Sequence, residues 1–170
     1  MLIAARNGII GNGLPYDREV EYLESTGAQY IDTGVKANNL TSVEIHFAFT
    51  RIFNDNAVVS MDSGSANSNA FTLEYYYKTT SKWGITFSFD GRGAMAYKGT
   101  TESELTQFNV IASADGIVVN GESYPQHSTP DSFSCPYSLL LFTYGRNGLP
   151  IIFGESRINY CCIYDKSYAN

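Results

Sequence analysis

The sequence has few charged residues and no long apolar run. Lys, Arg, Asp and Glu together make up 16% of its 170 residues, against about 25% in an average globular domain. No apolar stretch approaches the roughly 20 residues that a membrane-spanning helix needs, so no membrane span is expected. The 11 Lys and Arg residues are scattered, and the net charge is −6. Binding to a phosphate backbone requires clustered positive charge, so nucleic acid is not an expected partner.

Cysteine is also scarce, and the three present fit no zinc motif. Cys135, Cys161 and Cys162 form no C-x-x-C pair and have no pair of histidines nearby. On a strand, neighbouring residues point to opposite faces, so Cys161 and Cys162 are not expected to bridge each other. Buried free thiols are the favoured interpretation, and pairing of Cys135 with Cys161 or Cys162 is the alternative.

Oxygen-bearing side chains gather between residues 62 and 69, where Asp62 and Asn67 are candidate calcium ligands. Calcium prefers carboxylate and amide oxygens. The spacing matches no defined calcium loop, so a polar loop is the favoured interpretation. We therefore expect no cofactor, with calcium as the alternative.

A chain of this length is expected to form one domain with its own core. Residues 1–18 contain Gly and Pro and show no strand alternation, so we predict a short irregular N-terminal arm followed by a domain at 19–170. After Met1 the first apolar stretch is four residues long, Leu2 to Ala5, and Arg6 interrupts it, so no signal peptide is predicted. The arm is either an assembly peptide or a loose tail. Its candidate contact residues are Leu2, Ile3, Arg6, Ile9 and Ile10.

From residue 19 onward the pattern predicts an all-β domain. Residues 42–49 alternate between apolar and polar side chains, and 71–77 and 84–89 repeat that period of two. The segments 137–143 and 158–164 are almost continuously apolar, which predicts strands covered on both faces. Turn dipeptides separate these runs, and no amphipathic helix of 10 residues is found. Many short strands favour a sandwich or a barrel.

One stretch resembles a known family. Residues 21–34 read E-Y-L-E-S-T-G-A-Q-Y-I-D-T-G and resemble the opening hairpin of concanavalin A-like (LamG-like) jelly-roll domains, which occur in phage and prophage structural proteins and in gut-bacterial surface proteins. The later segments 117–121, 139–142 and 162–165 follow in the family's order, so the resemblance covers about residues 20 to 165. The family's Gly-Arg after the third strand is replaced by Ser60–Gly64. The resemblance implies a jelly-roll β-sandwich of two antiparallel sheets.

The resemblance also implies a function. We expect a virion surface protein of a phage or phage-like particle, a homo-oligomer that contacts other virion proteins or sister subunits through the arm and binds host surface glycans. A structural capsid or tail decoration protein and a bacterial cell-surface lectin-like module are the alternatives. Sugar sites in this fold combine stacking aromatic rings with polar side chains. The candidates are Tyr76, Trp83, Arg92, Tyr97, Tyr144, Arg146 and Asn147, for each of which an ordinary surface or core role is the alternative.

Enzymatic activity is not expected. Glucanases that resemble this fold carry E-x-D-x-x-E on one strand, and that string is absent here. A retaining glycosidase needs two carboxyls about 5 Å apart. Glu44 and Glu74 both face out of their predicted strands, but an unrelated placement is favoured. There is no G-x-S-x-G serine motif, and the two histidines, His46 and His127, have the setting of surface residues.

Overall fold

The structure is a computed structural model that describes residues 3–5, 21–64, 70–79, 82–89, 92–96, 104–125 and 133–165. For 3–5, 76–79, 82–83, 89, 92–96 and 165 the backbone alone is described. These residues form strands and turns, and no α-helix occurs within them. The predicted all-β fold is therefore confirmed.

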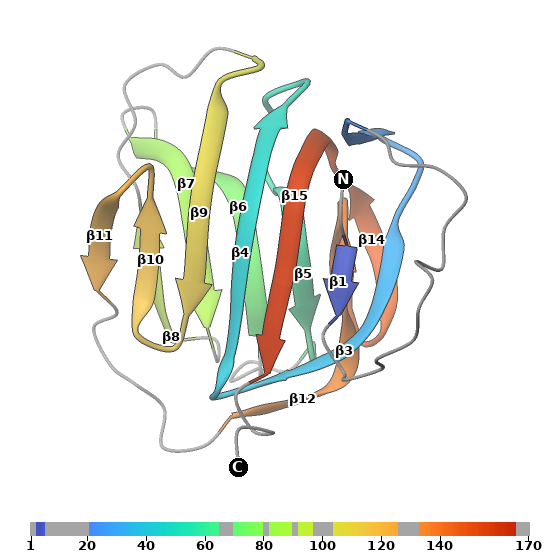
Figure 1. Ribbon diagram of the computed structural model, residues 1–170, viewed down its shortest axis with the longest axis vertical. Helices are drawn as coiled ribbons and strands as arrows, with labels where there is room; N and C mark the ends of the chain where they lie inside the picture. The colour runs from blue at the N-terminus through green and yellow to red at the C-terminus, as the bar shows by residue number, and fades with distance from the viewer. Residues whose placement is uncertain are drawn as a thin grey trace, which may run out of the picture.

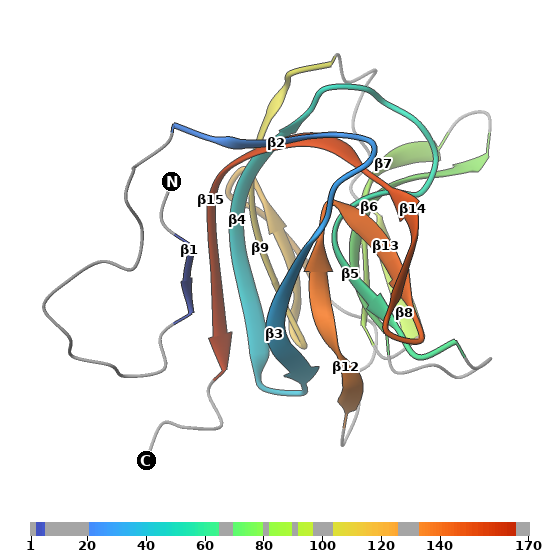
Figure 2. The same ribbon diagram turned by 90° about the vertical axis from the view of Figure 1, so that its right-hand side faces the viewer.

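Two sheets pack face to face, as Figures 1 and 2 show. In the described residues, the seven-stranded front sheet contains β1 (Ile3–Ala5), β15 (Glu155–Asp165), β4 (Thr41–Phe49), β9 (Gln107–Ser113), β10 (Gly116–Val119) and β11 (Glu122–Pro125), with β2 (Leu23–Thr26) also paired to β15. The eight-stranded back sheet contains β14 (Leu149–Phe153), β13 (Thr143–Arg146), β5 (Asn56–Asp62), β6 (Ala70–Thr79), β7 (Lys82–Phe89) and β8 (Arg92–Ala96), with β3 (Ile31–Asn38) and β12 (Ser134–Leu141) joined to it. The predicted β-sandwich is confirmed.

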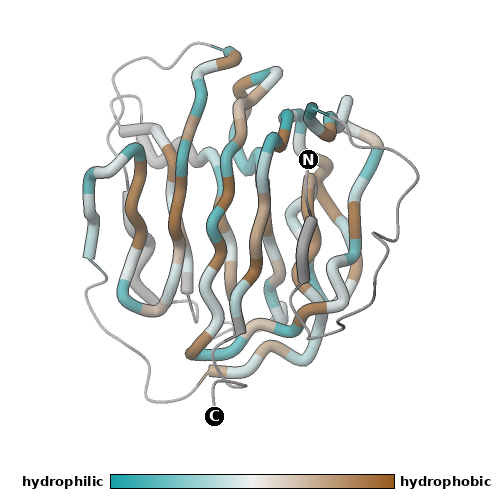
Figure 3. The backbone as a smooth tube through the Cα atoms, viewed as in Figure 1, coloured by the Kyte–Doolittle hydropathy of each residue, from teal (hydrophilic) through white to brown (hydrophobic). Residues whose placement is uncertain are grey.

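The core lies between the sheets and is rich in aromatic rings. Phe47 stacks on Phe108 with ring centroids 5.4 Å apart, within the front sheet. Phe49 meets Tyr75 of the back sheet edge-on at 5.7 Å, which joins the two layers. Apolar and polar residues alternate along the front strands, as the colours of Figure 3 show. The predicted inward faces of 42–49 and 71–75 are confirmed, because their apolar members are buried.

The two continuously apolar segments behave differently. Residues 139–143 are all buried, so the prediction that this strand is covered on both faces is confirmed for them. The same prediction for 158–164 is wrong, because Tyr164 is exposed and Tyr160 and Cys162 are only partly buried. A β-bulge at Asn159, described below, turns these three side chains away from the core.

The N-terminal arm begins with a short strand on the front sheet. Ile3, Ala4 and Ala5 pair in parallel with Cys161, Cys162 and Ile163 of β15 in the same chain. Leu2, Arg6, Ile9 and Ile10 lie outside the described residues. An assembly role for the arm stays a prediction.

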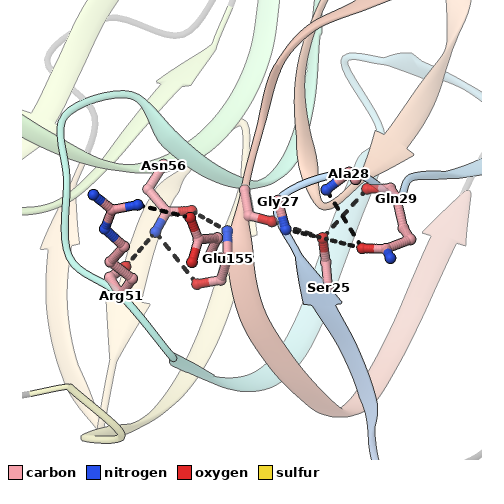
Figure 4. Close-up of polar contacts among 8 residues, drawn as sticks. Ser25, Gly27, Ala28, Gln29, Arg51, Asn56 and Glu155 are labelled. Atoms are coloured by element: carbon pink, nitrogen blue, oxygen red, sulfur yellow. Dashed lines mark hydrogen bonds and ion pairs between the residues drawn. The ribbon is translucent and has the colours of Figure 1, made fainter.

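A polar network explains the family-like sequence of the opening hairpin (Figure 4). The Ser25 hydroxyl donates a buried hydrogen bond of 2.7 Å to the Gly154 carbonyl, and the Gly27 amide donates to the Ser25 hydroxyl. The Gln29 side-chain oxygen accepts from the amides of Thr26 and Ala28. Gly27 has φ +87°, a region that favours glycine. Ser25, Gly27 and Gln29 of the S-T-G-x-Q segment thus hold the turn against the start of β15.

Asn56 continues this network into the back sheet. Its fully buried side chain donates to the Arg51 carbonyl at 2.7 Å and accepts from the Glu155 amide at 3.0 Å. Arg51 also forms an ion pair with Glu155 at 3.2 Å. The contacts of Asn56 and Arg51 with Glu155, drawn in Figure 4, connect segments about 100 positions apart in the sequence. The residues of the S-T-G-x-Q segment therefore have a structural role in the hairpin.

Candidate functional site

A group of polar side chains on the back sheet includes four of the predicted site residues. Asp62 ends β5, Tyr144 and Arg146 lie on β13, and Asn147 follows β13. We call these four residues the Asp62 cluster. The Tyr144 hydroxyl donates to Asp62 Oδ2 at 3.0 Å, and Arg146 Nε lies 3.5 Å from the same oxygen. The Arg146 guanidinium carbon lies 5.6 Å from the centre of the Tyr144 ring. An aromatic ring, a carboxylate and a guanidinium therefore meet at one point.

Local backbone geometry brings these side chains together. Asn147 and Gly148 both have positive φ, 53° and 79°, so they form a tight turn from β13 into β14. The Asn147 amide donates to the Asp62 carbonyl at 2.8 Å, which ties that turn to the end of β5. At Gly145 a Cβ atom would lie 2.7 Å from Met61 Cε and 3.2 Å from the Ser60 carbonyl oxygen, so a larger residue would require the Met61 side chain to shift and would crowd the β5 backbone.

The charges in the Asp62 cluster are balanced. Asp62 is buried, and its Oδ1 accepts a 2.7 Å hydrogen bond from the Gly64 amide. Burial raises the pKa of Tyr144 to about 12, so its hydroxyl stays protonated at neutral pH. The interaction with Tyr144, and then the negative charge of Asp62, raise the pKa of Arg146. Arg146 is half-exposed and always cationic, so its guanidinium is the charged group of the cluster that reaches solvent.

Beside the cluster, hydroxyl groups and one carboxyl line the same sheet. The hydroxyls of Ser60 and Thr72 lie 3.1 Å apart, and the Gly145 amide donates to Ser60 Oγ at 3.4 Å. Glu74 lies two residues after Thr72 on the same face of β6 and is nine-tenths buried. Its Oε2 is buried and has no hydrogen-bond partner in the part of the chain that the structure describes.

Burial, and then the nearby charge of Asp55, raise the pKa of Glu74 to about 8. A carboxyl with this pKa is largely protonated at pH 7, in contrast to the solvated charge that an outward-facing Glu would carry. The alternating pattern correctly predicts that Glu74 faces away from the core, but it contains no signal of burial on that side. Glu44 lies on the front sheet, so the two carboxyls do not meet, as favoured from the sequence.

For the other predicted site residues, the structure describes the backbone alone or does not include the residue. Tyr76, Trp83 and Arg92 lie on β6, β7 and β8 of the same back sheet, where only their backbone is described. Their register partners are Gly84, Tyr77 and Phe89. Tyr97 and Asn67 lie outside the described residues. Of the cluster members, Tyr144, Arg146 and Asn147 are candidate sugar ligands from the sequence, and Asp62 is the alternative calcium ligand.

The structure offers no metal cluster among the residues it describes. No group of three or more His, Cys, Asp and Glu side chains in these ranges is arranged to hold an ion. Asp62 is instead engaged by Gly64, Tyr144 and Arg146. None of the three cysteines forms a disulfide, so the alternative pairing of Cys135 is wrong, and Cys135 and Cys161 are buried. Burial raises the pKa of Cys161 to about 12, so this thiol is protonated and unreactive.

Comparisons with known proteins add no family. The sequence matches no protein-family model, and a search of curated proteins finds no relative. Within the described ranges, no helix has the length and apolar character that crossing a membrane requires.

Proposed function

We propose that this protein is a non-enzymatic surface protein of a phage or phage-like particle that binds host surface glycans. The observation that carries the proposal is the Asp62 cluster, where the Arg146 guanidinium lies over the Tyr144 ring and both groups contact a buried carboxylate. Sugars present apolar ring faces and many hydroxyl groups. A ring with fixed hydrogen-bond donors beside it matches both features. The resemblance to phage jelly-roll domains supports the virion location, and a bacterial cell-surface module is the alternative.

The chemistry of the cluster favours binding over catalysis. Asp62 accepts hydrogen bonds from Gly64 and Tyr144 and pairs with Arg146, so its charge serves to position these groups. Arg146 contacts Asp62 through Nε, and a guanidinium has four further N–H donors. The donors that are not engaged with Tyr144 are available for ligand hydroxyls. Since the arginine is half-exposed while Asp62 is buried, the ligand is expected to contact Arg146 first.

An array of bacterial surface polysaccharides tests the proposal. We expect a specific, saturable signal from the wild-type protein and an affinity at least about tenfold lower for Arg146→Ala. That change removes the exposed donors, and a hydrogen bond to a charged group contributes about 1.5–3 kcal/mol. Arg157→Ala is the matched control, since Arg157 pairs with Glu24 on the front sheet. A blank array from folded protein, or equal loss in both variants, would count against glycan binding at this cluster.

The decoration role is the second candidate, and strand β14 favours it. β14 ends the strand order of the back sheet within the described residues and carries no charged side chain. Leu149 and Ile151 are 65% and 47% exposed, and Tyr30, which contacts Phe153, is 46% exposed. An exposed apolar edge strand is a template for pairing with another chain. A decoration protein would use such an edge against a sister subunit.

Sedimentation of Ile151→Lys tests this second candidate. We expect the wild-type protein to self-associate and the variant to shift toward monomer, because a charge on an edge strand blocks edge pairing. Ile111→Lys is the control, since Ile111 is similarly exposed but lies on the front sheet. A wild-type protein that stays monomeric at all concentrations would exclude assembly through β14.

A further inference from the structure

The front sheet carries a second group of aromatic and polar side chains, and a β-bulge creates it. In the pairing of β15 with β4, Ile158 lies opposite Phe47 and Tyr160 lies opposite His46, so Asn159 is an extra residue. In a regular strand Tyr160 would face the core together with Ile158, because side chains two apart share a face. The bulge reverses this and turns Tyr160 outward. Bulges commonly re-aim side chains in this way at functional sites.

The outward side chains form a connected group on β15 and β4. We call Glu44, His46, Tyr160 and Tyr164 the front-face cluster. The ring of Tyr160 lies over that of His46 with centroids 5.0 Å apart, and the Tyr164 hydroxyl donates to Glu44 Oε2 at 3.1 Å. His46 Nε2 lies 3.9 Å from Glu44 Oε1. One oxygen of Glu44 is therefore hydrogen-bonded to Tyr164, and the other lies near His46 without a hydrogen bond to it.

This group is fixed and yet open to solvent. Tyr164 is 41% exposed, and so is the side chain of His46. Hydrogen bonds with Tyr160, then with Cys162 and Glu44, raise the pKa of Tyr164, so its hydroxyl remains a donor at neutral pH. Ile111 of β9 lies opposite Glu44 in the sheet and is also exposed, which extends the surface with an apolar side chain.

We propose that the front-face cluster is a second binding site, for a neutral saccharide. Tyrosine rings provide surfaces on which an apolar sugar face can lie, and the Glu44 carboxylate accepts hydrogen bonds from sugar hydroxyls. Glu44 is the charged side chain at its centre, which disfavours acidic sugars. Arg157, on the same sheet, is engaged with Glu24 and the Tyr22 ring. The inference does not rest on the Asp62 cluster, which lies on the other sheet.

Calorimetric titration with neutral oligosaccharides of glucose, galactose and mannose tests this site. We expect binding by the wild-type protein and a loss of at least about tenfold in affinity for both Glu44→Gln and Tyr160→Ala. Glu44→Gln keeps the side-chain shape at an exposed position, so it is expected to fold normally, and near-UV circular dichroism checks this. The matched control is Glu122→Gln, an exposed glutamate on β11 of the same sheet, with unchanged affinity expected.

The outcomes separate this inference from the proposed function. Binding that is lost in Arg146→Ala and kept in Glu44→Gln would overturn the front-face site while supporting the Asp62 cluster. Binding lost only in Glu44→Gln and Tyr160→Ala would support the front-face site and count against the Asp62 cluster. A wild-type protein that binds none of the neutral oligosaccharides, or that binds only acidic ones, would overturn the inference. Specific NMR shifts of Tyr160 and His46 on saccharide addition would support it further.

Discussion

At pH 8, Glu74→Gln is expected to be about 2–4 kcal/mol more stable than the wild-type protein. The buried Glu74 carboxyl has a pKa of about 8, against 4.5 for an ordinary glutamate. Each unit of pKa difference corresponds to about 1.4 kcal/mol, which sets an upper limit of about 5 kcal/mol before local relaxation. Between pH 4.5 and pH 8 the folded state keeps a proton that the unfolded state has released. Stability therefore falls as the pH rises through this window.

Urea unfolding at pH 5 and at pH 8 measures this effect. Near pH 5 the Glu74 carboxyl is protonated in the folded state and only partly ionised in the unfolded state, so the variant and the wild type are expected to differ by less than about 1 kcal/mol. Their difference grows toward pH 8, because glutamine has no proton to lose. Glu122→Gln is the control, since Glu122 is exposed. A difference for Glu74→Gln that does not change with pH would contradict the protonated state of Glu74.

Asn56→Ala is expected to lower the free energy of unfolding by about 2–4 kcal/mol. The change removes the fully buried side chain that bonds to the Arg51 carbonyl and the Glu155 amide. Each buried polar group left without a partner costs about 1–3 kcal/mol. The same side chain connects β5 to the start of β15, so its loss also loosens the opening hairpin held at Gly154.

Denaturant unfolding at fixed pH checks this second expectation. Asn109→Ala is the matched control, because Asn109 is exposed on β9 and its replacement is expected to change stability by less than about 0.5 kcal/mol. Equal unfolding midpoints for Asn56→Ala and Asn109→Ala would show that the network in Figure 4 contributes nothing to stability.

Much of the fold follows from the period-two pattern. Val43, Ile45, Phe47 and Phe49 alternate with polar residues, and all four are buried in the sandwich. The turn at Asn120-Gly121 is also predicted, because both residues adopt positive φ, 51° and 87°. These features depend on residues that are close together in the sequence, so they can be predicted from the sequence alone. The resemblance of residues 21–34 predicts the sandwich as well, and the contacts of Ser25 and Gln29 explain why those letters serve the fold.

The wrong predictions concern side chains whose orientation or burial depends on contacts between segments that are distant in the sequence. The bulge at Asn159 depends on how β15 pairs with β4, so the outward turn of Tyr160 is invisible in a run of apolar letters. Glu74 has the pattern of a solvated charge in its strand, yet it is nine-tenths buried in the folded protein. The front-face cluster is not predicted from the sequence for the same reason. With Tyr160 and Tyr164 expected to be covered in the core, His46 has the setting of an ordinary surface residue.

The Asp62 cluster is partly predictable. Tyr144, Arg146 and Asn147 stand out as polar and aromatic residues in one loop-like segment, and the structure keeps them together. Asp62 lies 82 positions before Tyr144, and only the register of β13 on β5 brings the two into contact. In the sequence, Asp62 is only an alternative calcium ligand within a polar loop, because its neighbours along the chain carry oxygen atoms. Its actual neighbours in space include an arginine.

Amide chemical-shift mapping on ¹⁵N-labelled protein decides whether the Asp62 cluster binds glycans. The ligand is the oligosaccharide unit of the polysaccharide that gives the strongest array signal. We expect saturable shifts centred on the amides of Gly64, Gly145 and Asn147, because these amides donate hydrogen bonds to Asp62 and Ser60 within or beside the cluster. Shifts confined to other parts of the protein, or no shifts for any saccharide, would contradict a glycan site at this cluster.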